Sequence, residues 1–142
     1  MNIKDIMTTE VQVLEPNDTL QTAAQKMRGH DIGLLPICDN DRLVGVVSDR
    51  DLAIRATAEG LDPKSTKVSQ IKSDDVAYCF DDQSVDEAAR VMQERQIRRL
   101  VVLDRKDKRM VGIVALGDVA TNGTSKTAGE VLEVVSEAPG QL

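Results

Sequence analysis

The sequence predicts a mixed α+β fold, an α/β sandwich, made of two copies of one β-α-β-β-α unit. Sliding the 142-residue chain against itself by 65 residues aligns positions 3–39 with positions 68–104 in residue type. Two extra residues in the loop RKDKR change the offset to 67, and Gly45 then aligns with Gly112. A register that holds over this length indicates an internal duplication.

Each copy begins with a short extended segment, 11–14 or 76–80, which an amphipathic helix follows. Apolar residues recur in these helices at i, i+3, i+4 and i+7, which is the spacing of one helix face. They are Leu20, Ala23, Ala24 and Met27 in the first copy, and Val85, Ala88, Ala89 and Met92 in the second. Ser84 and Glu87 have the spacing of a capping box, and Asp18 or Thr19 can cap the first helix.

Two apolar strands come next in each copy, LLPIC with LVGVV and LVVL with MVGIV, joined by the charged loops DNDR and DRKDKR. The strands do not alternate between polar and apolar residues, which predicts burial on both faces. A second helix then begins at Ser48 or near Leu116, and the first of these ends at Gly60.

These elements predict repeat 1 at residues 1–60, a linker at 61–67, repeat 2 at 68–122 and a C-terminal helix and tail at 123–142. The last helix is expected around 128–136. A unit of roughly 60 residues rarely buries enough apolar surface alone. We therefore expect the two repeats to pack face to face about a pseudo-two-fold axis, and apolar helix faces to be covered in a homodimer.

Composition limits the classes of partner. The net charge is −6, which disfavours general binding to nucleic acid or to an anionic membrane, and no apolar run is long enough to span a bilayer. The N-terminus is not a secretory signal, so we expect a cytoplasmic protein in which Cys38 and Cys79 are reduced thiols. These two cysteines and His30 do not form a zinc set, although a site completed across a dimer stays open.

The duplicated motif, GVVSDRDLA and GIVALGDVA, has chemistry suited to a ligand. Its glycine lets another backbone approach the strand closely. Unpaired amides where the helix starts at Ser48 favour an anion, and Asp51 can accept hydrogen bonds from both hydroxyls of a ribose. Alternatively, these two residues only cap the helix. The second copy has Ala115 in place of the hydroxyl but keeps Asp118, so reciprocal capping alone does not explain that carboxylate.

The stretches DIGLLPICDNDRLVGVVSDRDLA and QIRRLVVLDRKDKRMVGIVALGDVA resemble the cystathionine-β-synthase (CBS) domain repeat, and the pair resembles a Bateman module such as stand-alone bacterial CBS-pair proteins contain. The resemblance covers about residues 3–120. It implies a non-enzymatic module that binds AMP, ADP, ATP, S-adenosylmethionine or NAD in clefts between the repeats, and pairs that dimerise.

The resemblance also implies site residues. Asp51 and Asp118 match the ribose-binding aspartate of the family motif, and Ser48 matches its hydroxyl position, which contacts polyphosphate or sugar. Asp51 would share a cleft with Lys72, Ala77, Ile97, Arg98 and Arg99, and Asp118 would share one with Met7, Gln12, Ile32, Gly33 and Leu34. The apolar members of both sets would hold adenine.

The two guanidiniums favour phosphate, so we expect a phosphorylated nucleotide at the Asp51 cleft. We expect the Asp118 cleft to be empty or to hold a less negative ligand. Two simpler interpretations remain. Arg98 and Arg99 can lie in a solvated turn and pair with Glu94 or Asp104, and Lys72 can either contact phosphate or narrow the entrance.

The leading hypothesis is therefore a regulatory sensor of adenine nucleotides that acts on an unidentified protein partner. The main alternative is a ligand-free dimeric scaffold. An enzyme is disfavoured because no His-Ser or Cys-His constellation and no dense carboxylate cluster has motif support.

Overall fold

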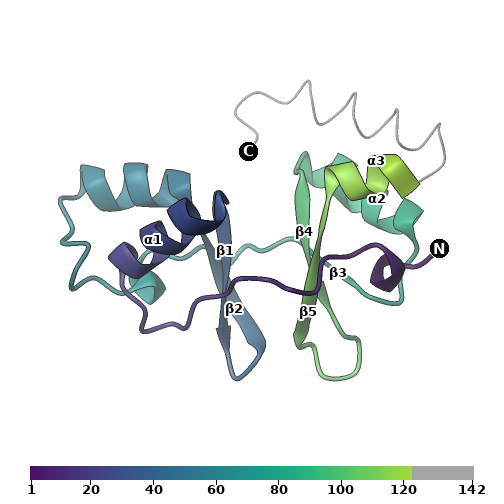
Figure 1. The fold of residues 1–142 in the computed structure, drawn as a ribbon, viewed down its shortest axis with the longest axis horizontal. Coiled ribbons are helices and arrows are strands. Elements are labelled where there is room, and N and C mark those ends of the chain that lie inside the picture. Colours follow the sequence, from purple (N-terminus) through teal and green to yellow (C-terminus); the bar gives the residue numbers. More distant parts are fainter. Residues whose placement is uncertain (123–142) are drawn as a thin grey trace. The chain divides into compact units, whose positions relative to one another are not determined.

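The computed structural model describes residues 1–122 and contains two compact units (Figure 1). The repeat-1 unit is residues 12–76, and the repeat-2 unit combines residues 1–11 with the chain from Ala77 onward. The C-terminal helix expected around 128–136 lies outside the described residues. Within residues 1–122, no helix combines the length and the apolar content needed to cross a bilayer.

The repeat-1 unit packs one amphipathic helix on a β-hairpin. Its elements are α1 (Leu20–His30), β1 (Leu34–Asp39), β2 (Arg42–Ser48), a π-helix (Asp51–Thr57) and a 3-10 helix (Val68–Gln70). The two strands are antiparallel. Leu35, Ile37 and Val47 of the hairpin form one buried cluster with the apolar face of α1. The predicted second helix is present, but most of it is π-helical.

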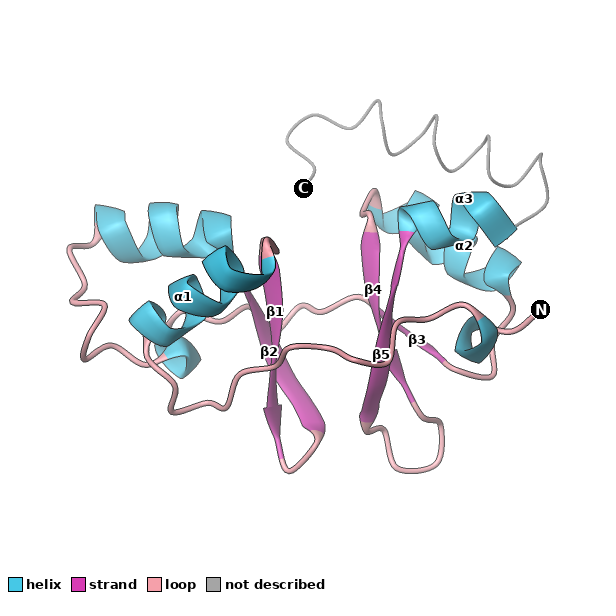
Figure 2. Cartoon of the chain, in the orientation of Figure 1, coloured by secondary structure: helices cyan, strands magenta, loops and turns pink. Residues whose placement is uncertain are grey.

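The repeat-2 unit contains all five elements of the predicted order. They are β3 (Tyr78–Phe80), α2 (Val85–Arg95), β4 (Arg99–Leu103), β5 (Met110–Ala115) and α3 (Leu116–Asn122), and a 3-10 helix (Ile3–Asp5) precedes them in the chain. β3 pairs with β4 in parallel, and β4 pairs with β5 antiparallel (Figure 2). Figure 1 shows α2 and α3 on the same side of β4 and β5, where their apolar residues form the core.

The first strand expected in repeat 1 is reduced to a single bridge between Leu14 and Ile37. In repeat 2 the corresponding strand continues, and the N–H of Asp81 donates to the carbonyl of Leu103 at 3.0 Å. The residue that aligns with Asp81 is Pro16. Because proline has no N–H, this ladder bond cannot form in repeat 1 and the strand ends.

The leading segments of the two repeats are exchanged. Thr8, in repeat 1, forms two backbone hydrogen bonds with Ile113 of β5 (2.8 and 3.0 Å). Ser73, in repeat 2, forms the matching pair with Val46 of β2 (2.9 and 3.0 Å). Each compact unit therefore contains the leading segment of the other repeat. The division into repeat 1 at 1–60, a linker at 61–67 and repeat 2 at 68–122 stays a prediction about the sequence repeats.

Glycine makes this exchange possible. A Cβ on Gly45 would lie 3.0 Å from the carbonyl oxygen of Ser73, and one on Gly112 would lie 2.8 Å from that of Thr8. Real Cβ atoms essentially never lie within 2.8 Å of another atom, and a distance of 3.0 Å is tighter than nine in ten real contacts. The close approach of the backbone therefore requires glycine at position 112 and favours it at position 45. The prediction made for Gly45 is confirmed, and Gly112 has the same role.

Capping groups define the helix ends. The Thr19 hydroxyl, rather than Asp18, accepts from the N–H of Thr22, and Ser84 and Glu87 form the predicted reciprocal box. Gly60 has a φ of 67°, as its position after a helix predicts.

One predicted core residue is wrong. Ala24 is exposed, whereas its counterpart Ala89 is buried in the core of its unit, where α2 packs against α3.

Candidate functional site

The Ser48–Asp51 motif of repeat 1 is a complete helix cap. The N–H of Ser48 donates to Asp51 Oδ2 at 2.9 Å, and the N–H of Asp51 donates to Ser48 Oγ at 3.0 Å. Ser48 is only 8% exposed. The second carboxylate oxygen, Oδ1, lies 3.9 Å from a guanidinium nitrogen of Arg55. The capping interpretation is therefore correct for this pair, and a ligand role would come in addition to it.

Repeat 2 keeps half of this cap. The N–H of Ala115 donates to Asp118 Oδ2 at 2.9 Å, although no hydroxyl is present to complete the reciprocal bond. The carboxylate thus has a structural role even without a serine, which the sequence comparison did not anticipate. Among the described residues, only Oδ2 of the Asp118 carboxylate accepts a hydrogen bond.

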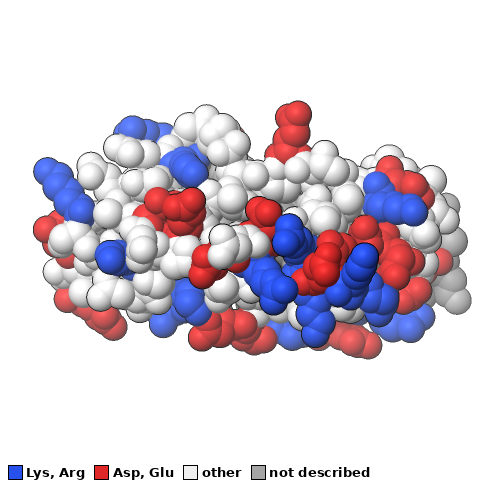
Figure 3. Space-filling model, turned by 90° about the horizontal axis from the view of Figure 1, so that it is seen from below, with Lys and Arg blue, Asp and Glu red and all other residues white. Residues whose placement is uncertain are grey.

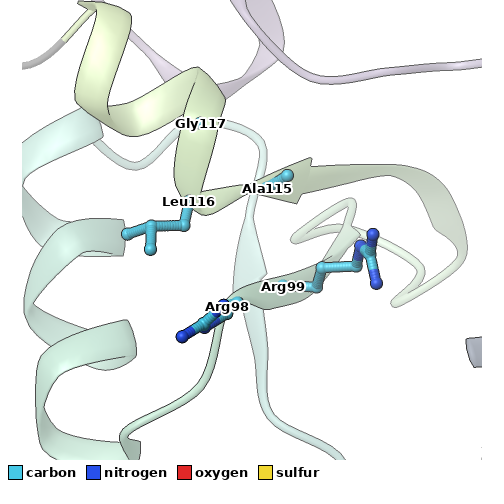
Figure 4. A pocket seen from close by; sticks show the side chains of 5 residues that line it. All are labelled: Arg98, Arg99, Ala115, Leu116 and Gly117. Atoms are coloured by element: carbon cyan, nitrogen blue, oxygen red, sulfur yellow. The ribbon is translucent and has the colours of Figure 1, made fainter. Parts of the chain in front are cut away.

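A pocket with a volume of about 340 Å³ lies at this end of the repeat-2 unit. It is lined by Arg98, Arg99, Ala115, Leu116 and Gly117 (Figure 4). The junction of β5 and α3 is tied to the start of β4, because Arg99 pairs with Ala115 and the N–H of Leu116 donates to the carbonyl of Arg98 at 2.7 Å. The sheet register therefore places two arginines near Ala115, whose N–H donates to the Asp118 carboxylate.

The two arginines are adjacent in sequence but point in opposite directions (Figure 4). Alternation along a strand explains this, since successive side chains point to opposite faces. Both residues are exposed. Within residues 1–122 neither guanidinium forms an ion pair, and the pairs considered with Glu94 and Asp104 are not present.

Lys72 lies against the glycine of the duplicated motif. Its Cδ would be 2.8 Å from a Cβ on Gly45, and its ammonium forms an ion pair with the Asp74 carboxylate. Lys72 and Asp51 belong to the same compact unit, whereas Arg98 and Arg99 belong to the other. The cleft predicted to unite all four residues stays a prediction.

The residues proposed for an adenine pocket have varied surroundings. Met7, Ala77 and Ile97 pack against the core of the repeat-2 unit, and Ile32 packs against the core of the repeat-1 unit. Gln12 is exposed. Leu34 is half-buried at the start of β1. Their contact with adenine also stays a prediction.

Two features of this region were missed by the sequence reasoning. Leu116 and Gly117 line the pocket, and the Asp49 carboxylate lies against Gly33 in the repeat-1 unit. The offset of 67 aligns Asp49 with Leu116, so the sequence shows that an acidic residue in repeat 1 is replaced by an aliphatic one in repeat 2. The sequence does not show that the Asp49 carboxylate contacts Gly33.

Whether Cys38, Cys79 or His30 binds a metal across a dimer stays open. No group of three potential metal ligands occurs in the part of the chain that the structure describes, and His30 is exposed at the end of α1. Burial raises the pKa of the Cys38 thiol to about 11 and that of Cys79 to about 12.

Acidic and basic side chains are interspersed on the face shown in Figure 3.

Comparisons with known proteins agree on one family. The model of the CBS domain matches residues 3–56 and 68–123. The chain is 40% identical over 136 residues to the CBS domain-containing protein YhcV of Bacillus subtilis, covering 95% of both chains. It is 43% identical over 118 residues to Hypoxic response protein 1 of Mycobacterium tuberculosis, covering 82% of this chain and 81% of the relative.

Solved structures show the same fold. Hypoxic Response Protein I, with two coordinated zinc ions, has a TM-score of 0.77 and 41% identity, covering 86% of this chain and 98% of its own. CBSX2 in complex with AMP has a TM-score of 0.71 and 28% identity, with coverages of 84% and 93%. The CBS domain pair of MJ0100, in complex with 5-methylthioadenosine and S-adenosyl-L-methionine, has a TM-score of 0.72 and 28% identity, with coverages of 89% and 98%.

Proposed function

We propose that this chain, which belongs to the CBS domain family, is a regulatory module whose Arg98–Arg99 pocket binds the phosphate of an adenine nucleotide. The carrying observation is a pocket of about 340 Å³ lined by two arginines that form no ion pair within the described residues. Because their side chains point in opposite directions (Figure 4), a phosphate in the pocket is expected to contact one guanidinium rather than both. This volume falls in the range of small-ligand sites. Guanidinium groups suit phosphate oxygens because they present parallel donors in a planar fork.

Asp118 is the proposed ribose acceptor at this pocket. Its Oδ2 is held by the N–H of Ala115, a pocket residue, and this bond fixes the carboxylate. We expected from the sequence that Asp51 would serve these arginines. The proposal uses Asp118 because that carboxylate and the arginines belong to one compact unit.

Related structures support an adenine ligand. CBSX2 was solved with AMP and the MJ0100 pair with S-adenosyl-L-methionine and 5-methylthioadenosine. We favour AMP, ADP or ATP over S-adenosylmethionine because the latter carries no phosphate to occupy the arginines. NAD, which has a pyrophosphate, remains the alternative consistent with the same two residues.

Thermal-shift and calorimetric titrations with AMP, ADP, ATP, S-adenosylmethionine and NADH test the proposal. A ligand present at 100 times its dissociation constant should stabilise the fold by roughly 2.7 kcal/mol. The double variant Arg98→Gly/Arg99→Leu, which installs the residues of repeat 1, should lose this stabilisation. Arg28→Gln, in the exposed last turn of α1, is the matched control and should retain it.

A ligand-free scaffold is the second candidate, because both motif aspartates already act as helix caps. In that case none of the five compounds would stabilise the protein, and no nucleotide would be released when the purified protein is denatured and analysed by mass spectrometry.

We further propose that the module works without catalysis, as a cytoplasmic homodimer that acts on a protein partner. One apolar side chain in the π-helix of the repeat-1 unit supports the dimer, since Ile54 is 56% exposed in the single chain. Sedimentation as a monomer at micromolar concentration would contradict the dimer, and turnover in an ATP hydrolysis assay would contradict the absence of catalysis.

A further inference from the structure

The two repeats differ at one pair of positions that lie in contact. In the repeat-1 unit, the N–H of Asp49 donates to the carbonyl of Gly33 at 2.9 Å. In the repeat-2 unit, the N–H of Leu116 donates to the carbonyl of Arg98 at 2.7 Å. The same backbone bond thus joins both pairs, so the positions correspond in the structure as well as in the sequence alignment.

The Asp49 carboxylate occupies the space beside residue 33. Its Oδ2 lies 2.9 Å from where a Cβ on Gly33 would be, and its Oδ1 accepts from the N–H of Arg50 at 2.8 Å. A side chain larger than hydrogen at position 33 would have to displace this carboxylate. Gly33 and Asp49 are therefore a sterically matched pair.

The corresponding pair in repeat 2 has the opposite character. Leu116 supplies an aliphatic side chain in place of the carboxylate, and Arg98 supplies a guanidinium in place of hydrogen. Leu116 is partly buried against the core of its unit, which leaves the guanidinium without an acid beside it. Within the described residues, the repeat-1 unit thus presents a fixed anion beside residue 33, whereas the corresponding residue of repeat 2 is Arg98, a cation without an ion pair.

We propose that Asp49 makes the repeat-1 unit reject phosphorylated ligands, so that each chain binds one phosphorylated nucleotide, at the Arg98–Arg99 pocket. The inference rests on the proposed function and names the residue that limits binding to one phosphorylated nucleotide per chain. A phosphate beside Asp49 would meet a like charge with no cation at positions 33 and 34, and like-charge juxtaposition is strongly disfavoured in a binding site.

Equilibrium dialysis with AMP and with adenosine tests this assignment, because the two probes differ only in the phosphate. Wild-type protein should bind one AMP per chain. Asp49→Asn keeps the shape of the side chain and removes its charge, so a second, weaker AMP should bind. The affinity for adenosine should change less than twofold in this variant, because adenosine carries no charge that Asp49 could repel.

A triple exchange provides the stronger test. Gly33→Arg/Leu34→Arg/Asp49→Leu gives repeat 1 the residues of repeat 2, and should bind two AMP per chain. The single change Leu116→Asp should weaken AMP binding at the repeat-2 pocket by at least tenfold. Circular dichroism and a denaturation curve establish whether each variant is folded. If the triple variant does not fold, the Asp49→Asn variant alone tests the proposal.

The outcomes separate the inference from the function on which it rests. Two AMP per wild-type chain, or one AMP per chain in both folded Asp49→Asn and the folded triple variant, would overturn the role of Asp49 and leave nucleotide binding intact. Wild-type protein that binds neither AMP nor any other phosphorylated nucleotide at millimolar concentration would overturn the proposed function itself.

Discussion

Replacing Ser48 by alanine should destabilise the protein, because it turns the cap of repeat 1 into that of repeat 2. In the native chain the Ser48 hydroxyl accepts from the N–H of Asp51 at 3.0 Å, and the N–H of Ser48 donates back to the carboxylate at 2.9 Å. Ser48→Ala removes the first bond and retains the second. The N–H of Asp51, in the first turn of its helix, then has no side-chain acceptor.

The expected loss is about 1 kcal/mol, the typical cost of replacing a serine cap by alanine. Ser48 is 8% exposed, so water compensates only in part for the missing acceptor. A difference of 1 kcal/mol moves the melting temperature of a chain of this size by roughly 3 °C.

The reciprocal variant makes the test sharper. Ala115→Ser adds a hydroxyl where the N–H of Ala115 already donates to the Asp118 carboxylate at 2.9 Å. Completing the box should stabilise the repeat-2 unit by up to about 1 kcal/mol. Urea denaturation of wild type and both variants, followed by circular dichroism, measures the two changes, which should have opposite signs.

The reasoning would be refuted if Ser48→Ala changed the free energy of unfolding by less than the roughly 0.5 kcal/mol typical of neutral surface substitutions. An Ala115→Ser variant less stable than wild type would equally show that the cap geometry of repeat 1 does not transfer to repeat 2.

Three further predictions concern other parts of the fold. Gly112→Ala should lower the free energy of unfolding, measured in urea, by about 1–3 kcal/mol, because its Cβ would lie 2.8 Å from a backbone oxygen. Gly29→Ala is the control: its Cβ would have no atom within 4 Å, so this variant should stabilise α1 by up to about 1 kcal/mol. Burial raises the pKa of both cysteine thiols, to about 11 and about 12, so Ellman's reagent at pH 8 should react slowly with native protein and rapidly with unfolded protein. Arg105 donates hydrogen bonds to Asp82 and holds the pKa of that carboxyl below 3.8. This pair therefore contributes stability above pH 3.8, which is lost as the pH falls through the native pKa. Arg105→Gln should move the pKa of Asp82 back toward 3.8 in a carboxyl NMR titration.

Local elements were predictable because their signals lie within a few residues. The spacing of apolar residues located α1 and α2, and the capping box at Ser84 and Glu87 formed as expected. The hairpins followed from apolar runs joined by charged loops. Local reasoning failed where one backbone donor mattered: Pro16 ends the first strand of repeat 1, and the alignment alone did not reveal that loss.

The candidate site was predictable only in part. The duplicated motif indicated Asp51, Asp118 and Ser48 as candidates; the structure shows their capping bonds, and their contact with a ligand stays a prediction. The sequence did not indicate that Asp118 would keep its bond to the N–H of residue 115 without a serine. Nor did it indicate that Arg98 would lie beside Leu116, because that neighbour is determined by the register of β4 against β5.

By itself, the sequence determined the duplication, the order of elements in repeat 2 and the capping box at Ser84 and Glu87, since these depend on spacing along a single segment. Tertiary structure decided which segments share a unit: Thr8 pairs with Ile113 and Ser73 with Val46, across long separations in the chain. It also decided the electrostatic difference between the repeats, because an aspartate beside Gly33 and a leucine beside Arg98 acquire opposite consequences only when the backbone brings each pair into contact.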